Sequence, residues 1–166
     1  MAVQPTGVEK SFDEDEIIVS KTDTKGVITY GNELFIKMSG YSEEELLGKP
    51  HNIIRHPAMP RSVFKLLWDT VQAKQEIFAY VINLAKDGSH YWVLANVTPS
   101  YDLNRQVIAY HSVRRKPNPA VVKQVEALYQ QMLQAEKAGG MEAGTRLLTS
   151  LLAEKGLSYE EFILSL

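Results

Sequence analysis

Few side chains in this sequence have the types and spacings that catalysis or metal binding requires. There are no cysteines, which excludes disulfides, thiolate metal ligands and cysteine nucleophiles. The four histidines, His51, His56, His90 and His111, are scattered without the spacing of a zinc site. The sequence has neither a nucleophile elbow nor a glycine-rich loop that could hold phosphate. We therefore expect a binding protein with no metal site and no enzymatic activity.

Two polar features suggest a ligand site. Asn83 lies in an apolar run, 77–85, that is typical of a buried strand, and an unpaired amide there would cost about 1–3 kcal/mol. Its carboxamide can both donate and accept hydrogen bonds. Arg55, followed by His56, offers a planar fork of donors suited to anionic oxygens. The alternatives are an asparagine that faces solvent or closes a strand, and an arginine that is a solvated loop charge.

Composition and charge are those of one globular domain with an appendage. The chain has 166 residues, of which 45% are hydrophobic and 23% charged, which excludes disordered and fibrous classes. The net charge of -2 leaves no large positive field for nucleic acid or anionic lipid, although residues 16–116 are net positive. No window approaches the ~18 apolar residues that span a bilayer, and the N-terminus lacks a signal pattern. We expect a cytoplasmic protein that neither binds nucleic acid nor inserts into a membrane.

Strand and turn signals predict an antiparallel sheet in two parts. Residues 16–22 and 27–30 flank a turn at 23–26 and form a predicted hairpin. Three longer runs, separated by Asp-Gly and Asp-Leu-Asn-Arg turns, predict strands at 77–85, 89–101 and 106–115. The sheet therefore draws its strands from both ends of residues 16–116.

Capping signals and helical periodicity predict the helices. Asn32 is the N-cap of a predicted helix at 33–38, and Ser42 begins a single turn with the spacing of a capping box. A longer helix follows Pro60. A further helix begins at Pro119 and ends at Gly139-Gly140, with a heptad-like seam at Val121, Val125, Leu128, Met132 and Ala135. Two more helical segments are predicted between residues 147 and 166.

This order of elements, over residues 16–116, resembles a PAS domain. The motifs that carry the resemblance are Asp23-Thr-Lys-Gly26, Asn32-Glu-Leu-Phe35, Ser39-Gly-Tyr41, Glu45-Leu-Leu-Gly48, Lys86-Asp-Gly88, Tyr91-Trp-Val93 and Thr98-Pro99. Further motifs resemble the sensory domain of bacterial aerotaxis receptors, namely Ile54-Arg-His-Pro-Ala-Met-Pro60, His90-Tyr-Trp-Val-Leu-Ala-Asn96 and Ser112-Val-Arg114. That family holds FAD non-covalently and reports cellular redox state. The resemblance implies an α+β fold, with a five-stranded antiparallel sheet, short helices on one face and C-terminal helices.

The resemblance also implies cofactor-binding residues. Asn83 matches the asparagine that reads the flavin ring, while Arg55 and His56 are placed at the pyrophosphate or the polar rim of the ring. The sequence departs from the family at an expected acidic position, where it has Ala58, and at three positions of the predicted strand 77–85, where it has Ile77, Ile82 and Leu84. Contacts to the ribityl or adenosine part are expected to differ accordingly.

Four more residues are placed by the same resemblance. Tyr91 is expected to point into the pocket, whereas Trp92 is expected on the outer face of the sheet. Arg114 falls where related flavin domains place a residue that senses the protonation of the ring. Asn32 is included in the site, although a helix N-cap explains an asparagine at this position equally well.

Other cofactors and a cofactor-free role are alternatives. FMN could replace FAD, and a haem sensor could use His51 or His56 as its axial ligand. A module without a cofactor could serve only to dimerise, through the outer face of the sheet and the seam after Pro119.

The domain division has three parts. Residues 1–15 are a predicted flexible leader, 16–116 the PAS sensory domain and 117–166 a C-terminal helical extension. We expect a homodimer, which signals to a partner that the sequence does not identify. The aerotaxis receptors continue into a membrane anchor and a signalling coil, so this chain is expected to be a stand-alone sensor or an excised input module.

Overall fold

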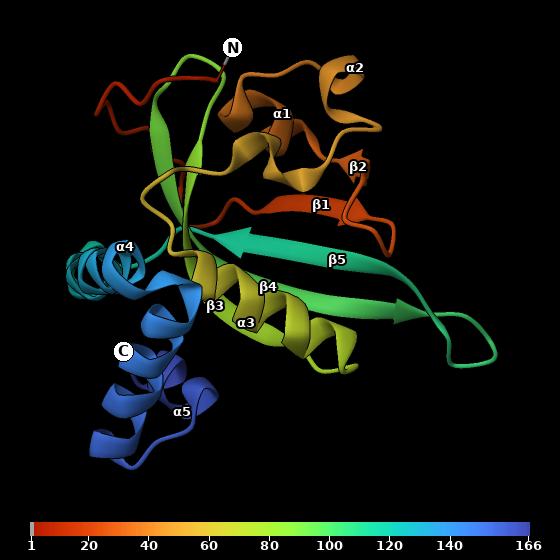
Figure 1. Cartoon of the computed structure of the whole chain (residues 1–166). Helices are drawn as coiled ribbons and strands as arrows, with labels where there is room; N and C mark the ends of the chain where they lie inside the picture. The colour runs from red at the N-terminus through yellow and green to blue at the C-terminus, as the bar shows by residue number, and fades with distance from the viewer. Residues whose placement is uncertain (1) are drawn as a thin grey trace.

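The computed structural model describes residues 2–166, in which five strands form one antiparallel sheet (Figure 1). The strands lie in the order β2-β1-β5-β4-β3. They are β1 (Ile18–Thr22), β2 (Ile28–Gly31), β3 (Ile77–Leu84), β4 (His90–Tyr101) and β5 (Val107–Arg115). The predicted α+β fold with a five-stranded antiparallel sheet is confirmed.

Short helices join β2 to β3 and cover one face of the sheet. They are α1 (Glu33–Ser39), α2 (Glu43–Leu46), the 3-10 helix η1 (His51–Ile54) and the longer α3 (Arg61–Gln72). Asn32 caps α1 by accepting a hydrogen bond from the Phe35 N–H at 3.0 Å. Ser42 and Glu45 form the predicted capping box at α2. Local capping therefore sets where both helices begin.

Strand register brings the polar candidates to one face. Asn83 pairs with Tyr91 across β3 and β4, and Ala95 pairs with Arg114 across β4 and β5. Because side chains alternate along a strand and paired residues share a face, Asn83, Tyr91 and Arg114 all point toward the short helices. Trp92 points to the opposite face.

The C-terminal extension folds back on the domain. Helix α4 (Pro119–Lys155) has non-helical dihedral angles at Gly139 and Gly140, where the sequence predicts a break, and α5 (Tyr159–Ser165) follows it. The seam residues Val121, Val125 and Met132 are buried in the same core as the sheet. This seam is therefore covered by its own chain, and a dimer built on it would have to displace these contacts.

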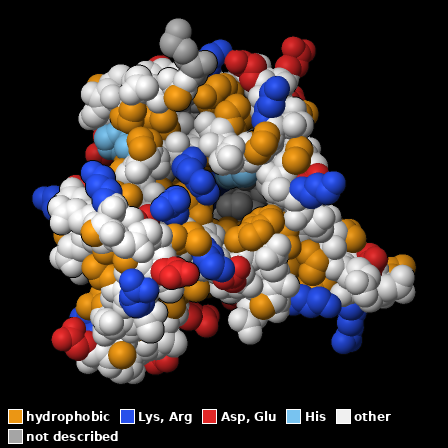
Figure 2. Space-filling model, viewed as in Figure 1, with side chains coloured by type: hydrophobic (Ala, Val, Ile, Leu, Met, Phe, Trp, Pro, Cys, Tyr) orange, Lys and Arg blue, Asp and Glu red, His pale blue; other side chains and the backbone are white. Residues whose placement is uncertain are grey.

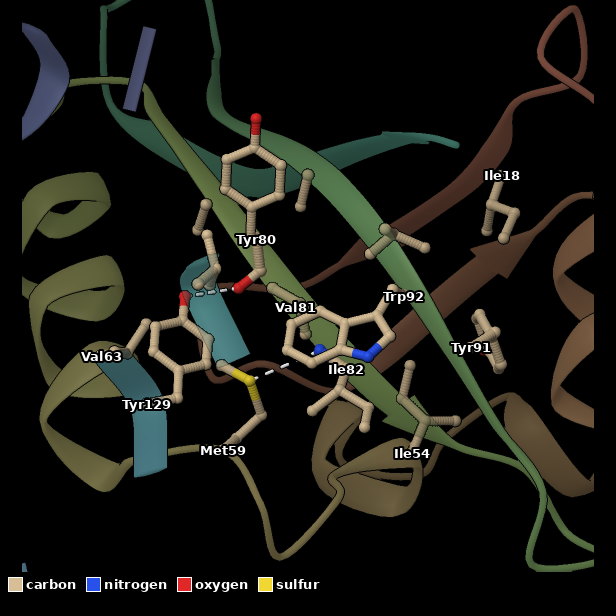
Figure 3. Packing of buried hydrophobic residues seen from close by; sticks show 14 of the residues in the cluster. Ile18, Ile54, Met59, Val63, Tyr80, Val81, Ile82, Tyr91, Trp92 and Tyr129 are labelled. Atoms are coloured by element: carbon tan, nitrogen blue, oxygen red, sulfur yellow. Dashed lines mark hydrogen bonds between the residues drawn. The ribbon is translucent and has the colours of Figure 1, made fainter. Parts of the chain in front are cut away.

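Tyrosines of the C-terminal helices cover the free edge of β3. The Tyr129 hydroxyl donates to the Tyr80 carbonyl at 2.6 Å (Figure 3), and the Tyr159 hydroxyl donates to the Phe78 carbonyl at 2.9 Å. The Tyr129 ring also stacks on Trp92, with 6.2 Å between centroids. Two edge carbonyls that no strand pairs are thus satisfied by side chains.

The N-terminal segment lies against the β3–β4 turn. The Thr6 N–H donates to the Gly88 carbonyl at 2.9 Å, and the Lys10 N–H donates to the His90 carbonyl at 2.7 Å. Phe12 is only 6% exposed and belongs to the core. This packing differs from the flexible leader expected for residues 1–15, because backbone pairing and one buried aromatic side chain outweigh the polar composition. Met1 lies outside the described residues.

Nothing in residues 2–166 forms a helix long and apolar enough to cross a bilayer.

Replacing Tyr129 by Phe should lower the free energy of unfolding by about 1 kcal/mol, because the Tyr80 carbonyl loses its buried donor. Urea unfolding followed by circular dichroism measures the change. Tyr30, whose side chain is exposed, is the control: Tyr30→Phe should change stability by less than about 0.5 kcal/mol. Equal effects of the two substitutions would contradict this role for the Tyr129 hydroxyl.

Candidate functional site

A cavity of about 320 Å³ lies between the inner face of the sheet, η1 and α3. In Figure 2 the face of the molecule is hollowed here, with hydrophobic and basic side chains around the hollow. The sheet forms the floor of the cavity with Val81, Ala95 and Val97. Helix α3 forms one wall with Phe64, Leu67 and Trp68. Trp68 was not among the predicted site residues. The lining is therefore mainly apolar, as ligand pockets usually are.

Asn83 brings an unpaired amide into this cavity. Its side chain is 4% exposed, and its Nδ2 atom has no hydrogen-bond partner. Its backbone forms an isolated antiparallel bridge with Arg55, which fixes the position of both residues. An unsatisfied buried donor is costly, so the Nδ2 atom is suited to an acceptor supplied by a ligand or a water molecule.

Arg114 buries a positive charge at the opposite side of the sheet's inner face. The residue is 3% exposed, its Nη2 donates to Ser20 Oγ at 2.7 Å, and its guanidinium lies 4.8 Å from the Phe35 ring centroid. Burial lowers the pKa of Arg114 to about 10, so the group stays charged at neutral pH. Its Nε atom has no partner.

His51 completes this polar cluster as a neutral acceptor. Its Nε2 lies 2.9 Å from Ser20 Oγ and 3.4 Å from Arg114 Nη1. Because a guanidinium can only donate, Nε2 is assigned as the acceptor, with the proton on Nδ1. The residue keeps some exposed surface, but desolvation, followed by the charge of Arg114, lowers the pKa of the imidazole to about 3. The cluster therefore carries one positive charge, on Arg114.

Two more cations lie on the lining of the cavity, and no carboxylate does. Lys25 and Arg55 are exposed lining residues, and the Arg55 guanidinium stacks 3.9 Å from the Phe64 ring centroid. Partial desolvation of its guanidinium lowers the pKa of Arg55. Within residues 2–166 neither of them, nor Arg114, forms an ion pair. An apolar slot with donors and uncompensated positive charge favours a flat ligand that presents acceptor or anionic atoms.

Three of the six predicted site residues line this cavity: Arg55, Asn83 and Arg114. Asn32 does not, because its carboxamide is used within the protein. Besides capping α1, its Oδ1 accepts from the Val19 N–H and its Nδ2 donates to the Ile17 carbonyl, both at 3.0 Å. The residue thus ties α1 to β1, a structural role that the N-cap alternative anticipates.

His56 and Tyr91 are buried away from the cavity lining. His56 Nδ1 accepts from the Ala58 N–H at 2.9 Å, and its ring meets His90 edge-on at 5.9 Å between centroids. Tyr91 is fully buried, its hydroxyl has no partner, and desolvation raises its pKa to about 12. The structure places neither residue among the groups that surround the cavity.

Sequence reasoning missed Ser20 and gave His51 only a possible haem role. Their connection to Arg114 depends on the pairing of Ser20 with Ser112 in β5, which no local pattern reveals. The inward position of Ser20 on an alternating strand is the only signal available from the sequence. Residues 2–166 contain no group of three acidic, histidine or cysteine side chains arranged to hold a metal.

Comparisons with known proteins agree with this architecture. The family model described as the PAS fold matches residues 28–114. The aerotaxis receptor of Escherichia coli (strain K12) is 36% identical over 143 residues, which is 86% of this chain and 27% of that protein. The nitrogen fixation regulatory protein of Klebsiella pneumoniae is 28% identical over 103 residues, 62% of this chain and 21% of that protein. The chain thus spans about a quarter of the length of these relatives.

Solved structures show the same fold. The dark structure of the blue-light photoreceptor Aureochrome1 LOV has a TM-score of 0.59 and 22% identity, covering 70% of this chain and 86% of that one. A structure described as "Flavin Analogue Sheds Light on Light-Oxygen-Voltage Domain Mechanism" has a TM-score of 0.57 and 22% identity, covering 69% of this chain and 86% of that one. The five-stranded sheet with helices on its inner face is the PAS fold. This chain belongs to the PAS family.

Acidification should destabilise the protein through His51. The unfolded chain protonates this imidazole near pH 6.5, but the folded protein does so only near pH 3, so the unfolded state binds more protons in between. The free energy of unfolding contributed by His51 should fall as the pH drops through that window, by up to ~1.4 kcal/mol per pH unit. Urea unfolding of the wild type and of His51→Gln at pH 7, 6, 5 and 4 measures the difference.

The control is His111→Gln, because burial lowers the pKa of this more exposed imidazole as well. It should reduce the pH dependence less than His51→Gln does. Identical pH profiles for the wild type and His51→Gln would show that His51 titrates normally in the folded protein.

Proposed function

We propose that this chain is the input module of a redox or oxygen sensor, which binds FAD non-covalently in the cavity and reports its state to a signalling partner. The observation that carries the proposal is the pair of unpaired buried donors, Asn83 Nδ2 and Arg114 Nε, on residues that line an apolar cavity. The relative named as an aerotaxis receptor supports the kind of signal. The proposal is for a binding and signalling module and not for an enzyme.

The residues present fit a flavin. A flavin offers a flat apolar ring system and several acceptor atoms, which suit the floor of Val81 and Ala95 and the buried donors of Asn83 and Arg114. The cavity of about 320 Å³ is at the lower end of ligand pockets, which span about 300–1,000 Å³. The exposed cations Lys25 and Arg55 suit the phosphates of a dinucleotide.

A bound flavin would supply reversible uptake of electrons and protons. Arg114 would hold the polar edge of the ring with a charge that it retains, because its pKa of about 10 is far above neutral. The same guanidinium donates to Ser20 on β1, so a change of charge in the cavity would compete with that hydrogen bond. Ser20 in turn contacts His51 on η1. Arg114 therefore links the cavity contents to β1 and η1.

Two alternatives fit the residues less well. As a haem ligand, His51 would have to give up an Nε2 contact with Ser20, and His56 does not line the cavity. A dimerisation module without a cofactor would use the outer face of the sheet and the seam of α4, and this seam is buried on its own domain. Homodimerisation itself stays a prediction. With no cysteine in the chain, a thiol adduct with the ring is chemically excluded.

The purified protein should be yellow, and Asn83→Ala or Arg114→Ala should weaken FAD binding about tenfold or more, because each removes a buried donor. Visible absorbance of the protein and titration of the stripped protein with FAD measure occupancy and Kd. The exposed residues Asn104 and Arg115 provide controls of the same residue types, and Asn104→Ala and Arg115→Ala should bind FAD as the wild type does.

A protein that stays colourless after refolding with FAD or FMN would overturn the proposal, and a Soret band would replace it with the haem sensor. Unchanged affinity in both Asn83→Ala and Arg114→Ala would remove the site assignment. Chromatography of the released cofactor distinguishes FAD from FMN.

A further inference from the structure

We infer that Glu136 is a clasp that fixes the C-terminal helix α4 to the cavity helix α3. Its Oε1 accepts a hydrogen bond from the Arg61 N–H at 3.0 Å. Its Oε2 accepts from the Ser62 N–H at 3.0 Å and from the Ser62 hydroxyl at 2.5 Å. Three hydrogen bonds therefore converge on one carboxylate from a helix that lies 74 positions earlier in the chain.

Helix α3 depends on this carboxylate for its cap. The residue at its N-cap position, Pro60, makes no side-chain hydrogen bond to the helix, so the N–H groups of Arg61 and Ser62 have no acceptor within α3. Glu136 supplies that acceptor and places a negative charge at the positive end of the helix dipole. The first turn of α3 itself contains no acidic residue.

The carboxylate in turn depends on α3. Glu136 is 8% exposed, and within residues 2–166 it forms no ion pair with a lysine or arginine. A buried charge is costly unless it is hydrogen-bonded, and α3 provides all of its donors. Separation of the two helices would leave a buried carboxylate and the end of a helix unpaired at once. This mutual dependence is what makes the contact a clasp.

A glycine permits the close approach. A Cβ atom added to Gly144 would lie 2.6 Å from both Glu136 Oε2 and Ser62 Oγ. Gly144 comes after the break at Gly139 and Gly140, whereas Glu136 comes before it. The two arms of α4 therefore meet at the N-terminus of α3, and a larger residue at 144 would force them apart.

The position of the clasp connects it to the cavity. The same helix that Glu136 holds lines the cavity with Phe64, Leu67 and Trp68. A ligand that shifts α3 would therefore strain or relax the hydrogen bonds to Glu136 and alter how firmly α4 is held. The clasp itself goes beyond the proposed function, and only its response to a ligand rests on that function.

Hydrogen exchange measured by mass spectrometry tests the clasp in the full chain. Glu136→Gln keeps the size of the side chain but presents a donor to one of the α3 N–H groups. Exchange in α4 and at the start of α3 should accelerate about tenfold or more, while β5 exchanges as in the wild type. Glu142→Gln, an exposed glutamate of the same helix, should change nothing. Wild-type exchange in folded Glu136→Gln would overturn the inference.

Gly144→Ala tests the clasp independently, because it retains the carboxylate of Glu136 but places a Cβ atom where Glu136 and Ser62 meet. It should accelerate exchange in the same two segments, and wild-type exchange would count against the clasp. If both variants unfold as a whole, Ser62→Ala decides, since it removes only the hydroxyl bond. Faster exchange confined to α4 in Ser62→Ala would support the clasp. Unchanged exchange in α4 would overturn it.

Addition of FAD separates this inference from the proposed function. In the wild type, FAD should change exchange in α4 by about threefold or more, and Glu136→Gln should still bind FAD but lose that response. If FAD does not bind to the wild type, the proposed function fails, and the ligand-free variants still decide on the clasp. If α4 responds equally in both proteins, the clasp is not the route from the cavity.

Discussion

Among residues 2–166 no carboxylate pairs with the buried charge of Arg114, and the inner face of the sheet is arranged around that charge. Ser20 accepts one of its hydrogen bonds, His51 is kept neutral beside it, and the Phe35 ring lies against the guanidinium. These contacts come from β1, η1 and α1, so the charge draws three separate elements toward β5. The Nε atom of this cation has no hydrogen-bond partner in the protein. A ligand that supplies an anionic or acceptor atom there would therefore bind more tightly.

The proposed ligand contacts and the contacts to the C-terminal helices lie on different sides of the same few elements. The inner face of β3, β4 and β5 lines the cavity, whereas the edge of β3 and the outer residue Trp92 contact the C-terminal helices. Helix α3 belongs to both sides, since one face lines the cavity and its N-terminus is held by Glu136. A perturbation in the cavity therefore has a short path to the C-terminal extension, through one rigid helix.

Local signals made most of the fold predictable. Asn32 and Ser42 cap helices where their spacing predicts, and the five strands lie within two residues of their predicted bounds. Contacts between distant segments could not be predicted from the sequence, because they have no signature in composition or periodicity. Examples are the contact of Glu136 with Ser62 and the pairing of residues 6–10 with the β3–β4 turn. Of the site, Asn83 was foreseen from its polar type in an apolar strand. The Ser20–His51–Arg114 cluster needs the register of β1 on β5, which only the folded sheet defines.

The tyrosine hydroxyls on the edge of β3 have a consequence for any shortened form of this protein. A fragment that stops at Lys116 would lose Tyr129 and Tyr159 together and leave the carbonyls of Phe78 and Tyr80 bare on an apolar strand. Such an edge is a template for pairing with a second molecule. Self-association of such a fragment would then result from the exposed edge of β3. It could easily be mistaken for the native oligomeric state of the full chain.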